Sequence, residues 1–324
     1  MTNPLSDEDA AVYETAARTA LAEFGVPDSE LHLVSVSENI TYRATNSDSQ
    51  FVVRLHRPGY LTYEELESEA VWLQALTDGG LDVPHPLTAL NGQQHVLIPI
   101  PNRAESRYGG LSRWVDGDVV GRSGQPTLDH FAQLGALMGT LHNQASQWNP
   151  PGGFRRRRLD SDGLLGEEPS WGRFWEHPAL ADDERRQLLT ARDQFRETLA
   201  DYGTDCNTFS MIHADLHLNN LLTKPDGNLS IIDFDDAGFG WHQYDLAVAL
   251  FHSDEAPDRP AARRALINAY RDTRPISDND LALVSMFEVI RGMAVIGWID
   301  QRPELGLSRE FVREVIETTI DGIG

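Results

Sequence analysis

Apolar residues alternate along short segments near the start of the chain and recur at helical spacing through most of the rest. Capping patterns at Ser6 and Thr62 each open a helical stretch that glycine ends. Strands are expected at residues 31–36, 40–45, 51–56 and 95–100. Further helices are expected at residues 127–146, 182–199, 281–300 and 308–321. This order, with strands around one helix and then mostly helices, predicts an α+β fold.

A tight turn brings two polar residues together in the second half of the chain. The apolar runs 221–223 and 229–232 flank Pro-Asp-Gly, in which proline fixes φ and glycine tolerates positive φ. They predict an antiparallel hairpin, in which the start of the first strand lies beside the end of the second. Asn220 and Asp233 are therefore expected side by side, and their oxygens suit Mg²⁺.

An acidic residue precedes this hairpin at a spacing that phosphoryl transfer uses. Asp215 stands five residues before Asn220, which is the offset of the Asp and Asn of the kinase catalytic loop. In that loop the Asp accepts the proton of the substrate hydroxyl. The sequence therefore predicts an ATP-dependent kinase.

The segment from His213 to about Leu250 resembles the aminoglycoside phosphotransferase and choline kinase-like family. That family carries H-x-D-x-x-x-x-N, then I-D, and here these patterns are the segment 213–220 and Ile231-Ile-Asp233. The resemblance implies that Asp215 is the catalytic base and that Asn220 and Asp233 are the magnesium ligands. It also implies that Asp245 braces the catalytic loop.

The resemblance further implies a two-lobed protein kinase-like fold. Residues 1–115 would form a strand-rich, nucleotide-binding lobe, and residues 116–324 would form a helical catalytic and substrate lobe. ATP and Mg²⁺ would bind in the cleft between them.

A kinase-like site needs a cationic side chain on the third strand to pair with the nucleotide phosphates. The only lysine, Lys224, lies in the turn after the catalytic loop, so Arg54 is the candidate. Arginine keeps the charge and adds a bidentate fork. Four glutamates of the following helix could position it, namely Glu64, Glu65, Glu67 and Glu69, and family spacing favours Glu69.

The nucleotide loop lacks the glycine pattern of protein kinases. Backbone amides of residues 37–40, including Asn39 and Ile40, are expected to cap the phosphates, although a plain hairpin turn fits the same residues. Trp114 and Val115 resemble the linker between the lobes, whose backbone would hold adenine. Buried hinge packing of the tryptophan is the alternative.

The net charge of −23 disfavours nucleic acid and anionic membranes as partners. It would attract an amine-bearing acceptor, although a solubilising surface or adaptation to a salty interior explains it equally well. One cysteine, the absence of a run of 18 apolar residues and a start without basic residues together predict a cytoplasmic protein.

The predicted substrate is a small molecule with a hydroxyl group, and three alternatives stay open. A protein Ser/Thr kinase of the bacterial stress-response type would share the fold. A two-metal hydrolase could use His213, Asp215 and His217 if they alternate along one strand face. An inactive nucleotide-binding module would account for the missing lysine.

Overall fold

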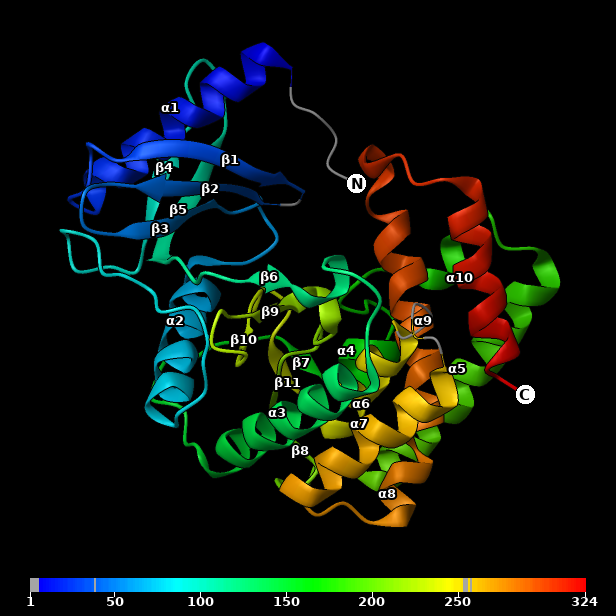
Figure 1. Ribbon diagram of the computed structural model, residues 1–324. Coiled ribbons are helices and arrows are strands. Elements are labelled where there is room, and N and C mark those ends of the chain that lie inside the picture. Colours follow the sequence, from blue (N-terminus) through cyan, green and yellow to red (C-terminus); the bar gives the residue numbers. More distant parts are fainter. Residues whose placement is uncertain (1–5, 38, 253–255, 257) are drawn as a thin grey trace. The chain divides into compact units, whose positions relative to one another are not determined.

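The computed structural model describes residues 6–37, 39–252, 256 and 258–324, which form two compact units (Figure 1). The strand-rich unit comprises Met1–Gly117, Asn149–Arg155 and Lys224–Asp235. The helical unit comprises Asp118–Trp148, Arg156–Thr223 and Asp236–Gly324. The candidate site residues are distributed over both units.

A five-stranded antiparallel sheet with the order β1-β2-β3-β5-β4 forms the strand-rich unit. The strands are β1 (Glu30–Val36), β2 (Ile40–Thr45), β3 (Gln50–Leu55), β4 (His95–Pro99) and β5 (Ser106–Arg113). The predicted strands are thus present, and β5 is an addition. Two glycines interrupt the apolar pattern of β5, and the sheet needs them because a Cβ at Gly110 would lie 2.8 Å from the ring of His95.

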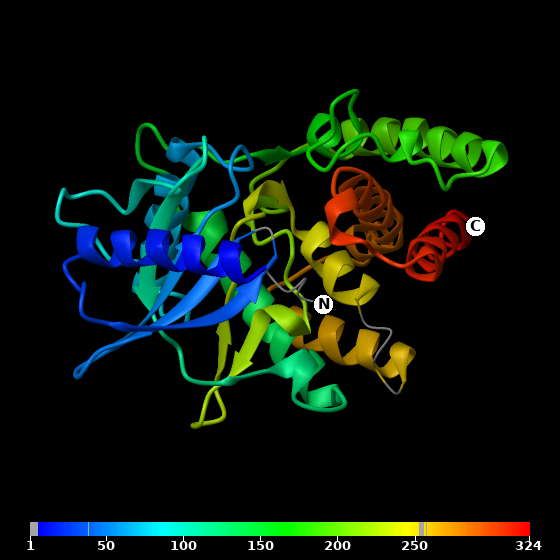
Figure 2. The same cartoon turned by 90° about the horizontal axis from the view of Figure 1, so that it is seen from above.

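Helix α1 (Asp7–Glu23) covers one face of this sheet (Figure 2). Small side chains of α1, such as Ala16 and Ala20, pack in one core with the buried strand residues Val53 and Leu55. The alternation of β3 therefore turns Arg54 away from that core. Burial of the apolar positions fixes the register, because a shift by one residue would bury the guanidinium instead.

Helix α2 (Tyr63–Asp78) begins with the predicted capping box, in which Thr62 and Glu65 exchange hydrogen bonds. Its apolar face is buried, and Trp72 packs edge-on against Phe234 at 5.6 Å between ring centroids. This contact holds the segment that carries Asp233 against α2. The same segment contains β10 (Leu229–Ile231) and the predicted turn, closed by a 2.9 Å hydrogen bond from Lys224 N to Asn228 O.

Helices build most of the helical unit. α3 (Leu128–Gln147) packs against α7 (Arg259–Thr273) so closely that a Cβ at Gly135 would lie 2.1 Å from the carbonyl oxygen of Leu266. α9 (Val284–Asp300) packs against α6 (His242–Phe251) and α10 (Arg309–Asp321). The remaining elements are β6 (Asp118–Val119), β7 (Arg158–Leu159), α4 (Ser161–Leu165), α5 (Asp182–Tyr202), β8 (Phe209–Ile212), β9 (Leu221–Thr223), β11 (Gly238–Trp241), α8 (Asp278–Ala282) and the 3₁₀ turns η1 (Val120–Arg122), η2 (Phe174–Glu176), η3 (Leu218–Asn220) and η4 (Pro303–Leu305).

One helical stretch, Asp278–Asp300, is long and apolar enough to cross a membrane by length and composition. The expectation that no segment approaches such a span therefore needs correction. In the structure 67% of the apolar window is buried inside the protein, where α9 packs against its neighbours. A core helix explains the composition.

A buried carboxylate fixes the backbone of the loop 213–217. Strand β8 ends at Ile212, and Ala214 follows with a φ of 65°, which an alanine rarely adopts. Asp245 at the start of α6 accepts hydrogen bonds from the backbone N–H groups of His213 (3.0 Å) and Ala214 (2.7 Å). Residues 213–217 therefore form a braced loop. The interpretation of His213, Asp215 and His217 as one face of a strand is wrong.

The brace predicts that Asp245→Asn destabilises the fold. Both carboxylate oxygens accept a backbone N–H, whereas asparagine offers one acceptor oxygen and an NH₂ group that faces the second donor. A buried N–H left without a partner costs about 1–3 kcal/mol. Urea denaturation should show a loss of this size.

Asp205→Asn is the matched control, because the exposed Asp205 accepts one backbone hydrogen bond, from Asn207, and asparagine can accept it too. Equal unfolding midpoints for the two variants would contradict the brace.

Candidate active site

The strand-rich unit surrounds Arg54 with carboxylates. Its Nη1 donates to Asp233 Oδ1 at 3.1 Å and to Asp235 Oδ1 at 2.9 Å. Burial disfavours the charge of Arg54, but the two aspartates and Glu69 outweigh burial and raise its pKa above the usual value. Arg54 is thus a fixed cation next to Asp233, whose φ of 68° is the second strained backbone position at the site.

The two nucleotide-loop candidates, Asn39 and Ile40, have different surroundings in the strand-rich unit. The buried Asn39 donates from Nδ2 to Asp235 Oδ2, and its Oδ1 accepts the backbone N–H of Arg57 at 3.0 Å. The side chain of Ile40 is part of the core. Glu38, which belongs to the same predicted loop, lies outside the described residues.

The four glutamates of α2 have different surroundings. Glu65 caps the helix, and Glu67 accepts backbone hydrogen bonds from Gln94 (3.1 Å) and His95 (2.9 Å). Glu69 is buried and contributes to the electrostatic stabilisation of Arg54, after Asp233 and Asp235. Glu69 is thus the glutamate of α2 that stabilises the charge of Arg54.

Trp114 and Val115 directly follow β5 and are both half-buried. The indole Nε1 of Trp114 donates to Asp116 at 3.0 Å, and the guanidinium of Arg43 lies 4.7 Å from its ring. Trp114 also lines a polar hollow of about 420 Å³ together with Asn46, Ser47, Asp48, Ser49, Gln50, Arg113 and Asp116. The chain passes into the helical unit after Gly117.

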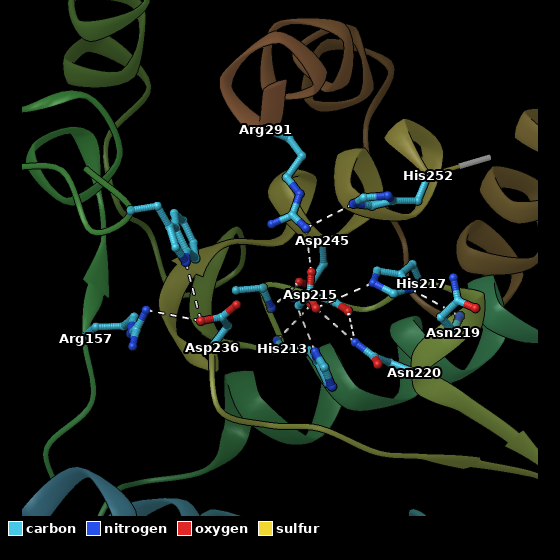
Figure 3. A network of polar contacts seen from close by, with 12 residues as sticks. Arg157, His213, Asp215, His217, Asn219, Asn220, Asp236, Asp245, His252 and Arg291 are labelled. Atoms are coloured by element: carbon cyan, nitrogen blue, oxygen red, sulfur yellow. Dashed lines mark hydrogen bonds and ion pairs between the residues drawn. The ribbon is translucent and has the colours of Figure 1, made fainter. Parts of the chain in front are cut away.

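In the helical unit three side chains hold the carboxylate of Asp215 (Figure 3). Asn220 Nδ2 donates to Asp215 Oδ2 at 3.0 Å and to the backbone oxygen of Asp215 at 2.8 Å. Arg291 Nη2 donates to Oδ1 at 2.5 Å, and His217 Nε2 lies 3.5 Å from Oδ2. The carboxylate is therefore fixed in one orientation, with a quarter of its side chain still exposed.

Burial would raise the pKa of Asp215, but the charges of His217 and Arg291 hold it well below the usual value. Asp215 is therefore ionised at neutral pH and can accept a hydrogen bond. The fully buried His213 serves the loop instead, because its Nδ1 accepts the backbone N–H of Asp215 at 3.3 Å.

Arg291 and His252 are site residues that the sequence analysis missed. Arg291 reaches Asp215 from α9, and its Nη2 also lies 3.0 Å from Nε2 of His252, which follows α6 (Figure 3). The available signal was an arginine inside the apolar run of α9. That signal could not identify Asp215 as the partner of Arg291, because Asp215 lies 76 positions away in the sequence.

The ligand atoms of Asp215, His217 and His252 lie within 4.8 Å of one another, a spacing that could hold a metal ion. His213, which the hydrolase alternative requires, is not part of this group. The guanidinium of Arg291 contacts Asp215 and His252 directly, so a positive charge already lies among the three residues.

Asp235 and Asp236, which follow Asp233, are both engaged in ion pairs. Asp235 accepts from Arg54, as described above, and Asp236 Oδ1 lies 3.2 Å from Arg157 Nη1 and 3.4 Å from Trp171 Nε1. Asp233 has the most exposed side chain of the three acids, with 45% accessible. Of the three, it is best placed to exchange its arginine contact for a cation.

Comparisons with known proteins agree with this chemistry. A family model described as the phosphotransferase enzyme family matches residues 31–278. The solved structure of a microcompartment-associated aminopropanol kinase is 31% identical, with a TM-score of 0.83 over 96% of this chain and 95% of that chain. An amicoumacin kinase in complex with AMP-PNP, Ca²⁺ and Ami is 19% identical, with a TM-score of 0.78 over 98% and 96%. Homoserine kinase of Pseudomonas aeruginosa is 28% identical over 250 residues, 74% of this chain and 71% of that protein.

These matches confirm the predicted α+β, protein kinase-like fold and the resemblance to the aminoglycoside phosphotransferase group. They also confirm the prediction of an ATP-dependent phosphotransferase with an alcohol group as acceptor. The chain belongs to the phosphotransferase enzyme family.

Proposed function

We propose that the enzyme transfers the γ-phosphoryl group of ATP, bound with Mg²⁺, to the hydroxyl of a small amino alcohol, and that Asp215 orients this hydroxyl. The contact between Asn220 and Asp215 supports the proposal most directly. Both hydrogen bonds from Asn220 Nδ2 go to Asp215, which fixes the carboxylate and leaves the amide oxygen of Asn220 without a hydrogen bond to the described residues. An oxygen of this kind suits Mg²⁺.

The residues present fit a magnesium nucleotide. We assign Asn220 in the helical unit and Asp233 in the strand-rich unit as oxygen ligands of the metal, because Mg²⁺ takes one or two protein groups together with phosphate oxygens. The bound metal would neutralise charge on the phosphates during transfer. Arg54 would exchange its bond to Asp233 for phosphate oxygens, while its bond to Asp235 keeps it in place.

Asp215 acts on the acceptor. Its ionised carboxylate accepts the hydrogen bond of the hydroxyl, and the hydroxyl oxygen attacks the γ-phosphorus as the bond to the leaving ADP oxygen breaks. The proton passes to Asp215 late, because a carboxylate with a strongly lowered pKa is a weak base. Orientation of the hydroxyl is therefore the main contribution of Asp215.

The acceptor class is inferred from relatives and from charge. Aminopropanol kinase and homoserine kinase are both named for acceptors that carry a hydroxyl and an amine. The net charge of −23 favours the approach of a cation. These observations favour an amino alcohol over a protein substrate.

The acceptor class can be tested by ADP release from ATP and Mg²⁺ with purified enzyme. We expect turnover with 1-amino-2-propanol or homoserine that exceeds turnover with 1,2-propanediol, which lacks the amine. Equal rates for the diol and the amino alcohols would contradict the role of the amine.

Substitutions of Asp215 and Asp233 should impair different steps, turnover in the first case and binding of the magnesium nucleotide in the second. Asp215→Asn keeps the shape and removes the charge, so kcat should fall by about a hundredfold or more with nucleotide affinity little changed. Asp233→Asn should instead weaken the binding of AMP-PNP and raise the Mg²⁺ concentration that half-saturates the enzyme. Steady-state kinetics and calorimetric nucleotide binding distinguish the two effects.

Asp226→Asn is the control for this pair, because Asp226 lies in the exposed turn of the same segment as Asp233. Near-full activity of Asp215→Asn would refute its assignment. An unchanged magnesium dependence of Asp233→Asn would do the same for the metal ligand.

Arg54→Ala should lower kcat/KM for ATP by roughly 10- to 100-fold, since a hydrogen bond to a charged group contributes about 1.5–3 kcal/mol. Arg54→Lys keeps the charge without the fork and should retain part of this activity. Arg18→Ala is the control, because Arg18 is an exposed arginine of the same unit that pairs with Glu14 on α1. If Arg54→Ala matched Arg18→Ala in kcat/KM, Arg54 would have no role in nucleotide binding.

A further inference from the structure

Arg291 is a buried charge in an apolar helix. The structure describes every residue of α9, and Arg291 alone among its buried residues is charged. Only 8% of Arg291 is exposed. Burial of a guanidinium costs several kcal/mol unless its charge is compensated. An apolar residue would stabilise α9 better, so the contacts of Arg291 must supply the reason for its presence.

The hydrogen-bond partners of the Arg291 side chain lie outside α9. A single nitrogen, Nη2, donates to Asp215 Oδ1 at 2.5 Å and lies 3.0 Å from His252 Nε2. Burial disfavours the charge of Arg291, but Asp215 and the hydroxyl of the fully buried Tyr244 outweigh burial and raise the pKa of Arg291 above its usual value. The charge of Arg291 is thus compensated mainly by Asp215.

The contact with Asp215 is complementary to that of Asn220. Arg291 bonds to Oδ1, whereas Asn220 bonds to Oδ2. Each carboxylate oxygen has two lone pairs. Oδ2 faces both Asn220 and His217, whereas Oδ1 faces Arg291 and keeps one lone pair to accept a further hydrogen bond. With both oxygens anchored, the carboxylate cannot rotate, and the remaining lone pair has a fixed direction.

We propose that Arg291 is a positioning residue for the phosphoryl acceptor: it locks the Asp215 carboxylate from α9 so that the free lone pair of Oδ1 points to the acceptor hydroxyl. His252 anchors the guanidinium from the end of α6. The inference rests on the proposed function of Asp215. It adds a residue from a distant helix to the catalytic loop.

Several charged or titratable groups face Asp215 and must be considered together. Arg291, His217 and His252 stabilise its negative charge. Asp245 and Tyr244 at the start of α6 also interact with this charge, Asp245 through its carboxylate and Tyr244 through its phenol hydroxyl. His252 is exposed as a residue, but desolvation of its ring and the charge of Arg291 lower its pKa well below the usual value. Arg291 is therefore the one permanent cation of this group.

The proposal is tested by kcat, by KM for the acceptor and by AMP-PNP affinity for Arg291→Gln and Arg291→Lys, with 1-amino-2-propanol or homoserine as acceptor. Glutamine removes the charged anchor of Oδ1, so kcat should fall about tenfold or more, while the affinity for AMP-PNP should stay at its wild-type value. Lysine keeps the charge but cannot hold both partners, so it should recover only part of the lost kcat.

Arg302→Gln is the matched control, because Arg302 is a second buried arginine, just after α9, that donates to the backbone oxygen of Trp298. Its kcat should not change. An Arg291→Gln enzyme with the wild-type kcat would overturn the proposal, as would an equal loss of kcat and of AMP-PNP affinity, which would indicate a general structural role.

His252→Ala provides a second variant if Arg291→Gln does not fold. Loss of the anchor should lower kcat several-fold and leave the affinity for AMP-PNP unchanged, whereas an unchanged kcat would refute the anchor. Asp215→Asn is assayed in parallel. Full activity of that variant would overturn the proposed function itself, whereas its loss without any effect of Arg291→Gln would overturn the positioning role alone.

Discussion

The loop that carries Asp215 depends on one buried carboxylate, that of Asp245. Two consecutive backbone N–H groups, of His213 and Ala214, donate to it, and His142 Nε2 lies 3.1 Å from the same carboxylate. Burial raises the pKa of Asp245 to about 6. These bonds hold Ala214 at a positive φ that it would not adopt alone. The direction of Asp215 follows from that backbone, and the contacts of Asn220 and Arg291 follow from the direction of Asp215.

A second constraint is the pairing of charges within each unit. In the strand-rich unit Arg54 neutralises two aspartates, and in the helical unit Arg291 neutralises Asp215. Removal of either arginine would leave an acid without its partner in a partly buried position, which costs more than a surface ion pair contributes. Arg54 contacts Asp233, which we propose as a metal ligand, and Arg291 contacts Asp215, which we propose to orient the acceptor hydroxyl. The same pairs thus stabilise the fold at the positions where we propose that the nucleotide and the acceptor bind.

Local patterns in the sequence were sufficient for most of the elements and for locating the loop in which Asp215 and Asn220 are in contact. Capping residues predicted α1 and α2, alternation predicted β1 to β3, and Pro-Asp-Gly predicted the turn after Lys224. Strand β5 was not predicted, because its glycines lack the apolar signal and are required by side chains of distant segments, such as His95 and Ile98 of β4 and Ala20 of α1. The short strands β7, β8 and β11 were not predicted either, since pairing of distant segments supplies their hydrogen bonds.

Arg291 shows the limit of sequence patterns most clearly. Within α9 it is a polar residue at a buried position, and helical spacing alone would count it as an irregularity. Its significance appears only when Asp215 and His252 are placed beside it, and each belongs to a different segment of the chain. Two histidines and an aspartate at this spacing would otherwise suit a metal ion. The guanidinium of Arg291 supplies a fixed positive charge there instead. The core helix α9 holds this guanidinium in one orientation.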